Sequence, residues 1–375
     1  MLITLDFPPM FGGVANYWAN LNRYFPSDNF VVLTQEYDNS LDFDMTQSYL
    51  IYRKNLFSKS RWLWPKWLPL LWETIKLARQ EKIKLLMCTH VLPVGTVCYI
   101  IKKLLRIPYV VSVHGLDISL SLNSPRKKVL ASKILRNAEK VIANSLATKE
   151  ILMANDLCFG ENVVIVYPCP NISFAPARET FLEKLKTDTR LIDKKIILTV
   201  ARLIERKGHD RVIQSLPKIL ETVPDAVYLI VGDGAQFRYL QELVELLKLQ
   251  EKIFFYTDAT DEELPGFYQM CDVFAMPVRK LSNGDVEGFG IVYLEANSFG
   301  KPVVAGRTGG AVEAVEHGIN GLLVDPESIN DVADTIAKLL LNKELAISLG
   351  ETGRKRVAEK FNWFEQSKKV VEIMN

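Results

Sequence analysis

Residues 284–295 read G-D-V-E-G-F-G-I-V-Y-L-E and place Glu287 and Glu295 eight positions apart around a glycine-rich turn. Residues 291–298 favour a helix that the following glycine and proline would end, so Gly288-Phe289-Gly290 is predicted to form its N-terminus. A helix start with little side-chain bulk suits an anion. Glu295, about two turns along, has apolar neighbours, so we expect its carboxylate to be buried and to need a ligand or a donor. The stretch therefore predicts a site for a phosphorylated ligand with two hydroxylated parts.

Short apolar runs on both sides of this stretch alternate with segments long enough for helices. The runs are 2–5, 30–34, 84–88, 109–113, 141–143 and 163–166 in the first half, and 196–200, 227–231, 252–255, 272–275, 302–305 and 321–324 in the second. Such alternation predicts a parallel α/β protein. Because the pattern restarts after a charged stretch, we predict two Rossmann-like domains joined by a linker near 172–195.

Length and composition agree with a two-domain globular protein. The chain has 375 residues, 48% of them hydrophobic and 24% charged, which is enough for two separate cores. It contains no apolar run of about 18 residues and no signal-peptide pattern at its start. The five cysteines are scattered without a C-x-x-C pair, which argues against a disulfide framework and a zinc site. We therefore expect a cytoplasmic protein.

The charge is unevenly distributed along the chain. Residues 1–175 carry a net charge of +7 and residues 176–375 a net charge of −5. Both halves are of mixed sign, so no nucleic-acid partner is expected. The basic first half favours an anionic acceptor or peripheral contact with an anionic membrane, on the inner face of the cell membrane.

Four of the six tryptophans fall within residues 61–72, which read R-W-L-W-P-K-W-L-P-L-L-W. Trp62, Trp64 and Trp67 therefore lie among basic residues, a combination typical of a membrane interface. A loop buried against the first domain is the alternative. If the acceptor is a lipid, we expect the membrane to be met here.

Small and polar residues follow predicted strands of the first half. Gly12-Gly13 lie between the first strand and a helical stretch, where a bare backbone would let a phosphate or sugar approach the helix start. A tight turn is the alternative. Asp6 would contact an acceptor or cap the turn. His114 ends the run 109–113, a position that suits either a ligand site at a strand end or a structural role.

Cations and glycines follow predicted strands of the second half. Arg202 and Lys207 come just after a strand, and two cations there, one able to bind bidentately, suit a diphosphate. Solvated surface charge is the alternative, and it is the interpretation that we prefer for Arg206. Gly232 and Gly234 form a G-x-G after the next strand, by itself a weak indication of nucleotide binding.

The spacing of the two glutamates resembles the E-x7-E motif of the retaining glycosyltransferases of family 4, and the likeness covers most of the chain. Further stretches similar to the family, in family order, are D-F-P-P with G-G in 6–13, H-G at 114–115, A-R-L-I-E-R-K-G at 201–208, V-G-D-G at 231–234 and F-A-M-P at 274–277. Within the family, the chain is most similar to the mannosyltransferases that act on phosphatidylinositol mannosides.

The resemblance implies a GT-B fold, in which two Rossmann-like domains face each other across a cleft. Residues 1–175 would form the N-terminal acceptor domain and residues 176–356 the C-terminal nucleotide-sugar donor domain. Residues 357–375 would form a C-terminal helix that crosses back to pack on the first domain.

The resemblance also implies roles for individual residues. Arg202 and Lys207 match residues that bind the donor's diphosphate, Glu287 the one that contacts the donor sugar, and Glu295 the one that binds ribose. His114 matches a histidine near the anomeric centre. The residues implied as catalytic are His114, Arg202, Lys207 and Glu287. Those implied as donor-binding are Gly12, Gly13, Arg202, Lys207, Gly232, Gly234, Glu287, Gly288, Phe289, Gly290 and Glu295. Those expected at the acceptor or membrane are Asp6, Trp62, Trp64 and Trp67.

The activity implied is that of a retaining hexosyltransferase. It would move a sugar, preferably mannose from GDP-mannose, to a lipid or glycan acceptor without a cofactor or metal. Asp42-Phe43-Asp44 spells D-x-D, the metal motif of a different glycosyltransferase fold, but lacks its context. The alternatives are an enzyme that uses a UDP- or ADP-sugar with a soluble acceptor, and a non-catalytic nucleotide- or sugar-binding protein. The presence of Arg202, Lys207, Glu287 and Glu295 argues against the last, because a plain binder needs no diphosphate clamp beside a sugar-contacting carboxylate.

Overall fold

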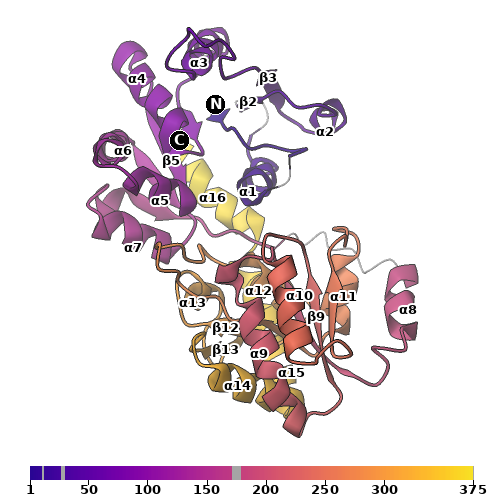
Figure 1. The fold of residues 1–375 in the computed structure, drawn as a ribbon. Coiled ribbons are helices and arrows are strands. Elements are labelled where there is room, and N and C mark those ends of the chain that lie inside the picture. The colour runs from indigo at the N-terminus through magenta and orange to yellow at the C-terminus, as the bar shows by residue number, and fades with distance from the viewer. Residues whose placement is uncertain (11, 27–29, 171–178, 375) are drawn as a thin grey trace. The chain divides into compact units, whose positions relative to one another are not determined.

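The computed structural model describes residues 1–10, 12–26, 30–170 and 179–374. The chain divides into two compact units, Met1–Pro168 with Trp363–Asn375, and Cys169–Asn362. These divisions fall a few residues from the boundaries expected at 175 and 356. Each unit is built on its own parallel sheet with helices on both faces (Figure 1).

The first unit forms, within the described residues, a seven-stranded sheet in the order β3-β2-β1-β4-β5-β6-β7. Its strands are β1 (Leu2–Ile3), β2 (Val31–Gln35), β3 (Leu50–Lys54), β4 (Leu86–Cys88), β5 (Tyr109–Val113), β6 (Lys140–Ala143) and β7 (Val163–Ile165). Its helices are α1 (Gly13–Asn22), α2 (Leu41–Met45), α3 (Leu68–Gln80), α4 (Thr96–Leu105), α5 (Leu116–Leu122), α6 (Pro125–Asn137), α7 (Leu146–Ala154) and α16 (Trp363–Met374).

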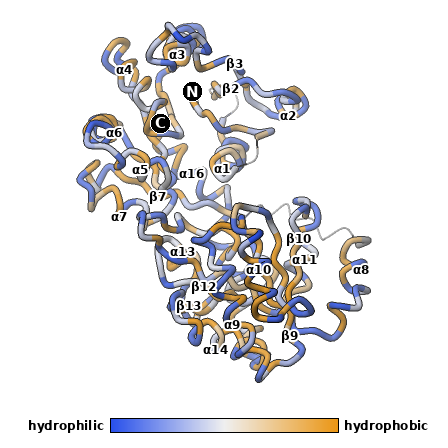
Figure 2. The backbone as a smooth tube through the Cα atoms, in the orientation of Figure 1, coloured by the Kyte–Doolittle hydropathy of each residue, from blue (hydrophilic) through white to orange (hydrophobic). Residues whose placement is uncertain are grey.

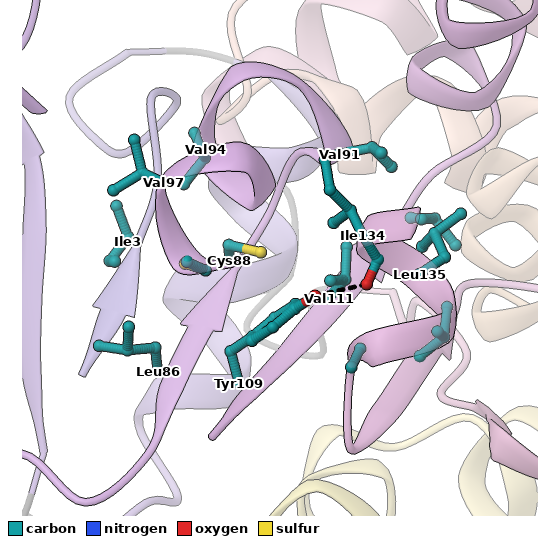
Figure 3. Packing of buried hydrophobic residues seen from close by; sticks show 14 of the residues in the cluster. Ile3, Leu86, Cys88, Val91, Val94, Val97, Tyr109, Val111, Ile134 and Leu135 are labelled. Atoms are coloured by element: carbon teal, nitrogen blue, oxygen red, sulfur yellow. Dashed lines mark hydrogen bonds between the residues drawn. The ribbon is translucent and has the colours of Figure 1, made fainter. Parts of the chain in front are cut away.

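Both faces of this sheet are buried. Ile3, Cys88 and Val111 contribute to the apolar cluster in Figure 3, which side chains of α3, α4 and α6 complete. Within it the Tyr109 hydroxyl donates a hydrogen bond of 2.5 Å to the Ile134 carbonyl, so this buried polar group is satisfied. Because helices cover both faces, the strands read as continuous apolar runs, which is why most of them could be predicted.

The last helix, α16, belongs to the first unit although α15 (Lys343–Lys360) belongs to the second. The Trp363 ring lies edge-on to the Tyr17 ring of α1, with centroids 5.7 Å apart. The Gln366 side-chain oxygen accepts a hydrogen bond of 2.9 Å from the Tyr167 amide. This is the returning C-terminal helix that the GT-B resemblance implies.

The second unit forms, within the part of the chain that the structure describes, a six-stranded sheet in the order β10-β9-β8-β11-β12-β13. Its strands are β8 (Lys195–Val200), β9 (Ala226–Val231), β10 (Ile253–Tyr256), β11 (Val273–Met276), β12 (Val303–Gly306) and β13 (Gly321–Val324). Besides α15, its helices are α8 (Glu179–Thr187), α9 (His209–Thr222), α10 (Phe237–Leu246), α11 (Leu264–Met270), α12 (Ile291–Ser298), α13 (Ala311–Ala314) and α14 (Ile329–Leu341).

Helices α9 and α10 of the second unit are amphipathic. Leu240 and Val244 of α10 are buried in one cluster with Leu216 of α9 and Ile230 of β9. Hydrophilic and hydrophobic residues accordingly both occur along these helices in Figure 2. A helix with one apolar face on a sheet has this pattern.

Two elements differ from the sequence-based expectations. Strand β3 was not predicted, because it lies at the sheet edge, is partly exposed and forms no continuous apolar run. Residues 179–187, expected within a linker, form α8, where Phe181 lies 5.4 Å from Phe267 of α11 between ring centroids. Residues 172–178 of that expected linker lie outside the described residues.

Candidate functional site

The predicted donor residues of the second unit gather at the carboxyl ends of two neighbouring strands. Strands β8 and β11 pair in parallel, while the next strands along the chain, β9 and β12, lie on opposite outer sides of them. Ligands of open α/β sheets bind at such a switch point. The loop after β8 carries Arg202 to Lys207, and the loop after β11 carries Glu287. Strand order thus joins residues about 80 positions apart.

Glu287 forms a buried ion cluster with two cations of the β8 loop. Its Oε2 accepts a hydrogen bond of 2.5 Å from Arg206 Nη1 and one of 2.6 Å from Lys207 Nζ. Burial by itself would raise the pKa of Glu287, but the charges of Lys207 and Arg206 outweigh it and hold the pKa below its ordinary value. Glu287 is therefore a carboxylate at neutral pH.

The prediction that Arg206 is a solvated surface residue was wrong. Its exposed fraction is 9%, and its Nε also lies 3.2 Å from an Asp285 carboxylate oxygen. A buried guanidinium needs such partners because an unpaired buried charge is costly. Arg202, by contrast, is exposed and has no ion pair with any described residue, which leaves its guanidinium available to a ligand.

The glycine-rich turn leads directly into a helix, as predicted. Gly290 has φ 87° and caps α12, which begins at Ile291. The Phe289 side chain is buried and lies 5.7 Å from Phe361 between ring centroids, so only its backbone can face a ligand. The Gly310 amide donates a hydrogen bond of 2.9 Å to the Glu287 carbonyl, which fixes the turn against the β12 loop.

Glu295 has a hydrogen-bond donor inside the protein. The Tyr268 hydroxyl of α11 donates a hydrogen bond of 2.7 Å to Glu295 Oε2. Burial raises the pKa of Glu295 to about 7, although the hydrogen bond from Tyr268 opposes the rise. The hydrogen-bond donor expected for Glu295 is thus Tyr268. The sequence did not indicate it, because a tyrosine on an apolar helix is usually interpreted as a core residue.

The G-x-G turn packs tightly against the β8 loop. A Cβ on Gly232, which has φ 131°, would lie 2.3 Å from the Ala201 carbonyl oxygen, and one on Gly234 would lie 2.5 Å from that of Leu203. The Leu203 amide donates a hydrogen bond of 2.9 Å to the Asp233 carbonyl. Close packing against the β8 loop therefore requires glycine at both positions, and this contact positions the loop that carries the cations.

His114 follows β5 in the first unit. Its Nε2 lies 3.1 Å from Ser112 Oγ, and the Tyr17 ring lies edge-on to the imidazole at 5.1 Å. Its amide donates a hydrogen bond of 3.0 Å to Asp117 Oδ1. Burial lowers the pKa of His114 to about 3, so the ring is neutral at physiological pH.

Asp6 pairs with a histidine that the sequence analysis did not single out. Asp6 Oδ2 lies 3.2 Å from His90 Nε2, and the Thr89 hydroxyl lies 2.7 Å from His90 Nδ1. The hydrogen bond from His90 lowers the pKa of Asp6. Asp6 follows β1 and His90 follows β4, the strands at which order reverses in this sheet, so strand topology was the signal that was missed.

Gly12 and Gly13 stand at the start of α1 with open space beside them. A Cβ on either glycine would meet no described atom within 4 Å. Packing within the described residues therefore does not require glycine at these positions. Close approach of a ligand to the backbone remains the reason predicted from the sequence.

The tryptophan-rich stretch is largely exposed. Trp62 is 97% exposed and Trp64 83%, which excludes the alternative of a buried loop for these two. Trp67 differs from them, because it packs against the apolar cluster of the first unit. Contact of Trp62, Trp64 and Trp67 with an acceptor or a membrane stays a prediction, and Trp67, next to the start of α3, is only partly exposed.

Asp42-Phe43-Asp44 lies in α2, and Asp44 is engaged in an ion pair of 2.7 Å with Arg53. Among the described residues, no group of three or more His, Cys, Asp or Glu is placed to hold a metal ion.

The helices of the described ranges include none long and apolar enough to cross a membrane.

Two family models match adjoining parts of the chain. Residues 11–173 match "Glycosyltransferase Family 4", and residues 183–356 match "Glycosyl transferases group 1". A GDP-mannose-dependent alpha-(1-6)-phosphatidylinositol monomannoside mannosyltransferase of Mycolicibacterium smegmatis is 29% identical over all of this chain and 98% of its own length. The protein of that name from Mycobacterium tuberculosis is 33% identical over 70% of this chain and 68% of its own length.

Among solved structures, the fold is similar to that of Anabaena HepE in complex with UDP. The two chains superpose with a TM-score of 0.84 over 100% of this chain and 99% of that one, at 21% identity.

The two parallel-sheet units, the returning α16 and the superposition on HepE define a protein of the GT-B fold class. With the matches in sequence, the assignment becomes narrower. This chain belongs to glycosyltransferase family 4.

Proposed function

We propose that this protein transfers mannose from GDP-mannose to a lipid or glycan acceptor with retention of configuration and without a metal. The observation that carries the donor part is the meeting of Arg202, Lys207 and Glu287 at the β8/β11 switch point, with Glu295 on the helix that follows. Two cations beside a carboxylate suit a diphosphate joined to a hydroxylated sugar.

Each residue has a separate proposed role. Arg202 and Lys207 bind the diphosphate and offset the charge that develops on the leaving nucleotide. Glu287 accepts hydrogen bonds from the donor sugar, and Glu295 from the ribose. The open backbone at Gly12-Gly13 accommodates a phosphate or sugar.

Retention is proposed to follow from displacement on one face of the sugar. The bond from the anomeric carbon to the diphosphate oxygen breaks, the acceptor oxygen bonds to the same face, and the departing phosphate takes the acceptor's proton. His114 fits this scheme as a neutral polar group near the anomeric centre, because its pKa of about 3 makes it a poor proton donor at neutral pH.

GDP-mannose is preferred as donor because the two mycobacterial relatives are named as GDP-mannose-dependent. The structural neighbour HepE is described in complex with UDP, so a UDP-sugar donor with a soluble acceptor is the second candidate. A non-catalytic nucleotide- or sugar-binding protein is the candidate of another class.

A lipid acceptor would require contact with a bilayer, and the first unit has a surface suited to it. Exposed Trp62 and Trp64 precede α3, while α4 and α6 contain seven basic residues and no acidic one. Arg126, Lys127 and Lys128 of α6 are exposed and form no ion pair with a described residue. Exposed aromatic and basic side chains together favour an anionic membrane interface.

A thermal-shift panel of GDP, UDP, ADP and their sugar conjugates, with EDTA present, tests the donor. A ligand that binds the folded state raises the melting temperature, so a shift with GDP and GDP-mannose is expected. A shift with UDP or ADP compounds alone would replace the donor while keeping the activity. No shift with any of them would refute the nucleotide-sugar enzyme. For an active preparation, the anomeric configuration of the product by NMR tests retention.

A further inference from the structure

Lys207 is paired with Glu287, although it is also the residue proposed to bind the donor's diphosphate. Arg206 Nη1 and Lys207 Nζ both donate to the same Oε2 oxygen of Glu287, which is 8% exposed. Among the described residues, Glu287 is the one ion-pair partner of Lys207. The Lys207 ammonium is therefore bonded to a carboxylate, and it would have to leave that carboxylate to bind a diphosphate.

Arg206 is anchored more firmly than Lys207. Its Nε lies 3.2 Å from Asp285, and its carbonyl accepts a hydrogen bond of 3.0 Å from the Arg279 amide. Arginine stays charged at any physiological pH and its planar fork serves two carboxylates at once. Lysine is a single point charge on a flexible stem, so Lys207 can turn to a new partner while Arg206 stays.

If Lys207 left Glu287 without a replacement, a buried carboxylate would lose its counter-charge, which is strongly unfavourable. Arg206 removes most of that cost, because it remains bonded to the same oxygen.

We propose that Arg206 is a positioning residue that holds Glu287 so that Lys207 can exchange from this carboxylate to the diphosphate of the donor. In this arrangement Glu287 competes with the diphosphate for Lys207 and is freed to face the sugar when the donor binds. The inference rests on the proposed function, because it takes Lys207 as the diphosphate ligand.

A double-mutant cycle on nucleotide affinity tests the exchange. The dissociation constants of GDP and UDP are measured by calorimetry for the wild type, Glu287→Gln, Arg206→Met and the double variant. Glu287→Gln frees Lys207, so we expect binding at least about threefold tighter, although turnover falls. Arg206→Met leaves Lys207 as the cation that is hydrogen-bonded to Glu287 among the described residues, so we expect binding about tenfold weaker. In the Glu287→Gln background, Arg206→Met should change affinity less than about twofold.

The cycle separates positioning from a general charge effect. If Arg206 acted only by adding positive potential, its removal would weaken binding equally in both backgrounds, and that result would overturn the proposal. Arg206→Lys keeps the charge and should restore part of the affinity. If Arg206→Met does not fold, Glu287→Gln alone still decides, since weaker GDP or UDP binding in that variant contradicts competition for Lys207.

The proposed function fails in a different way. A wild-type protein that binds neither nucleotide refutes the donor site itself. A wild-type protein that binds one of them, with additive effects in the cycle, refutes only the role of Arg206.

Discussion

The Tyr268 hydroxyl donates a hydrogen bond of 2.7 Å to Glu295 Oε2, and the Tyr268 ring stacks on Phe299 with centroids 5.6 Å apart. The donor comes from α11 and the carboxylate from α12, so two helices fix the position of one acid. Burial nevertheless raises the pKa of Glu295 to about 7, against the effect of this hydrogen bond.

Nucleotide affinity should depend on pH through Glu295. Only the carboxylate accepts hydrogen bonds from both ribose hydroxyls, so affinity should rise as pH increases through about 7. Calorimetric titration of GDP between pH 6 and 8, a range that spans about one unit on either side of this pKa, measures the dependence. Glu295→Gln should abolish it. Because the tyrosine hydrogen bond lowers the pKa, Tyr268→Phe should move the transition to higher pH; an unmoved transition would separate Tyr268 from this role.

The same pKa predicts a stability change. Since the folded-state pKa of about 7 exceeds the ordinary value of 4.5, the folded protein binds more protons between these values, and the free energy of unfolding should fall as pH rises through that window. Denaturant unfolding of the wild type and Glu295→Gln measures it. The variant should lack this component of the fall, and identical pH profiles would contradict a raised pKa.

His114 should destabilise the fold in acid. Its pKa falls from 6.5 to about 3 on folding, so the unfolded chain binds more protons and stability is lost as pH falls below about 6.5. His114→Gln should flatten the dependence of melting temperature on pH in that window. His209, whose pKa burial lowers to about 4, acts in the same direction. His209→Gln should therefore also flatten the dependence of melting temperature on pH, and the two substitutions together should flatten it further.

Turnover should depend strongly on Lys207. Removing a cation that offsets charge on the leaving diphosphate typically lowers kcat about 100-fold or more, and this is the expected effect of Lys207→Ala. Initial rates of sugar transfer or donor hydrolysis measure it. Lys252, a lysine of the same unit that donates a hydrogen bond to the Pro224 carbonyl, gives the control Lys252→Ala, which should leave the rate unchanged. A loss smaller than about tenfold in Lys207→Ala would favour the non-catalytic binder.

The exposed tryptophans should control membrane binding. Trp62→Ser with Trp64→Ser should lower sedimentation with vesicles of anionic phospholipid about tenfold, because each buries a large apolar surface at the interface. Trp67 is left unchanged, since it is partly buried and packs against the apolar cluster of the first unit. Leu246→Ser, at a 76% exposed position of the second unit, is the control for loss of exposed apolar surface. Equal binding of all folded variants would refute contact through these residues.

Much of the fold could be predicted from the sequence, because its signals are local. Strand β5 and strand β13 coincide with the predicted runs 109–113 and 321–324, since buried parallel strands are continuously apolar. Strand β3 was missed because it lacks such an apolar run. As an exposed edge strand it needs no apolar run, so its residues carry little local signal.

The candidate site could be predicted only in part. The helix start after Gly290 follows from local glycine and helix preferences, and the structure has it there. His90 and Tyr268 were missed because each gains its meaning from a partner far along the chain, Asp6 at 84 positions and Glu295 at 27. The packing of Trp67 against the apolar cluster of the first unit could not be predicted from the aromatic and basic residues around it in sequence, because the cluster is formed by residues elsewhere in the fold.

The sequence by itself determined the strand and helix periodicity, the glycine-rich turn and the spacing of Glu287 and Glu295, because these depend on backbone preferences and on neighbours within a few residues. The tertiary structure alone decided that Arg206 is buried and shares one oxygen of Glu287 with Lys207. A charged side chain becomes buried only where the fold supplies an opposite charge. Here that charge comes from a loop 81 positions away, which the pairing of β8 with β11 brings into contact.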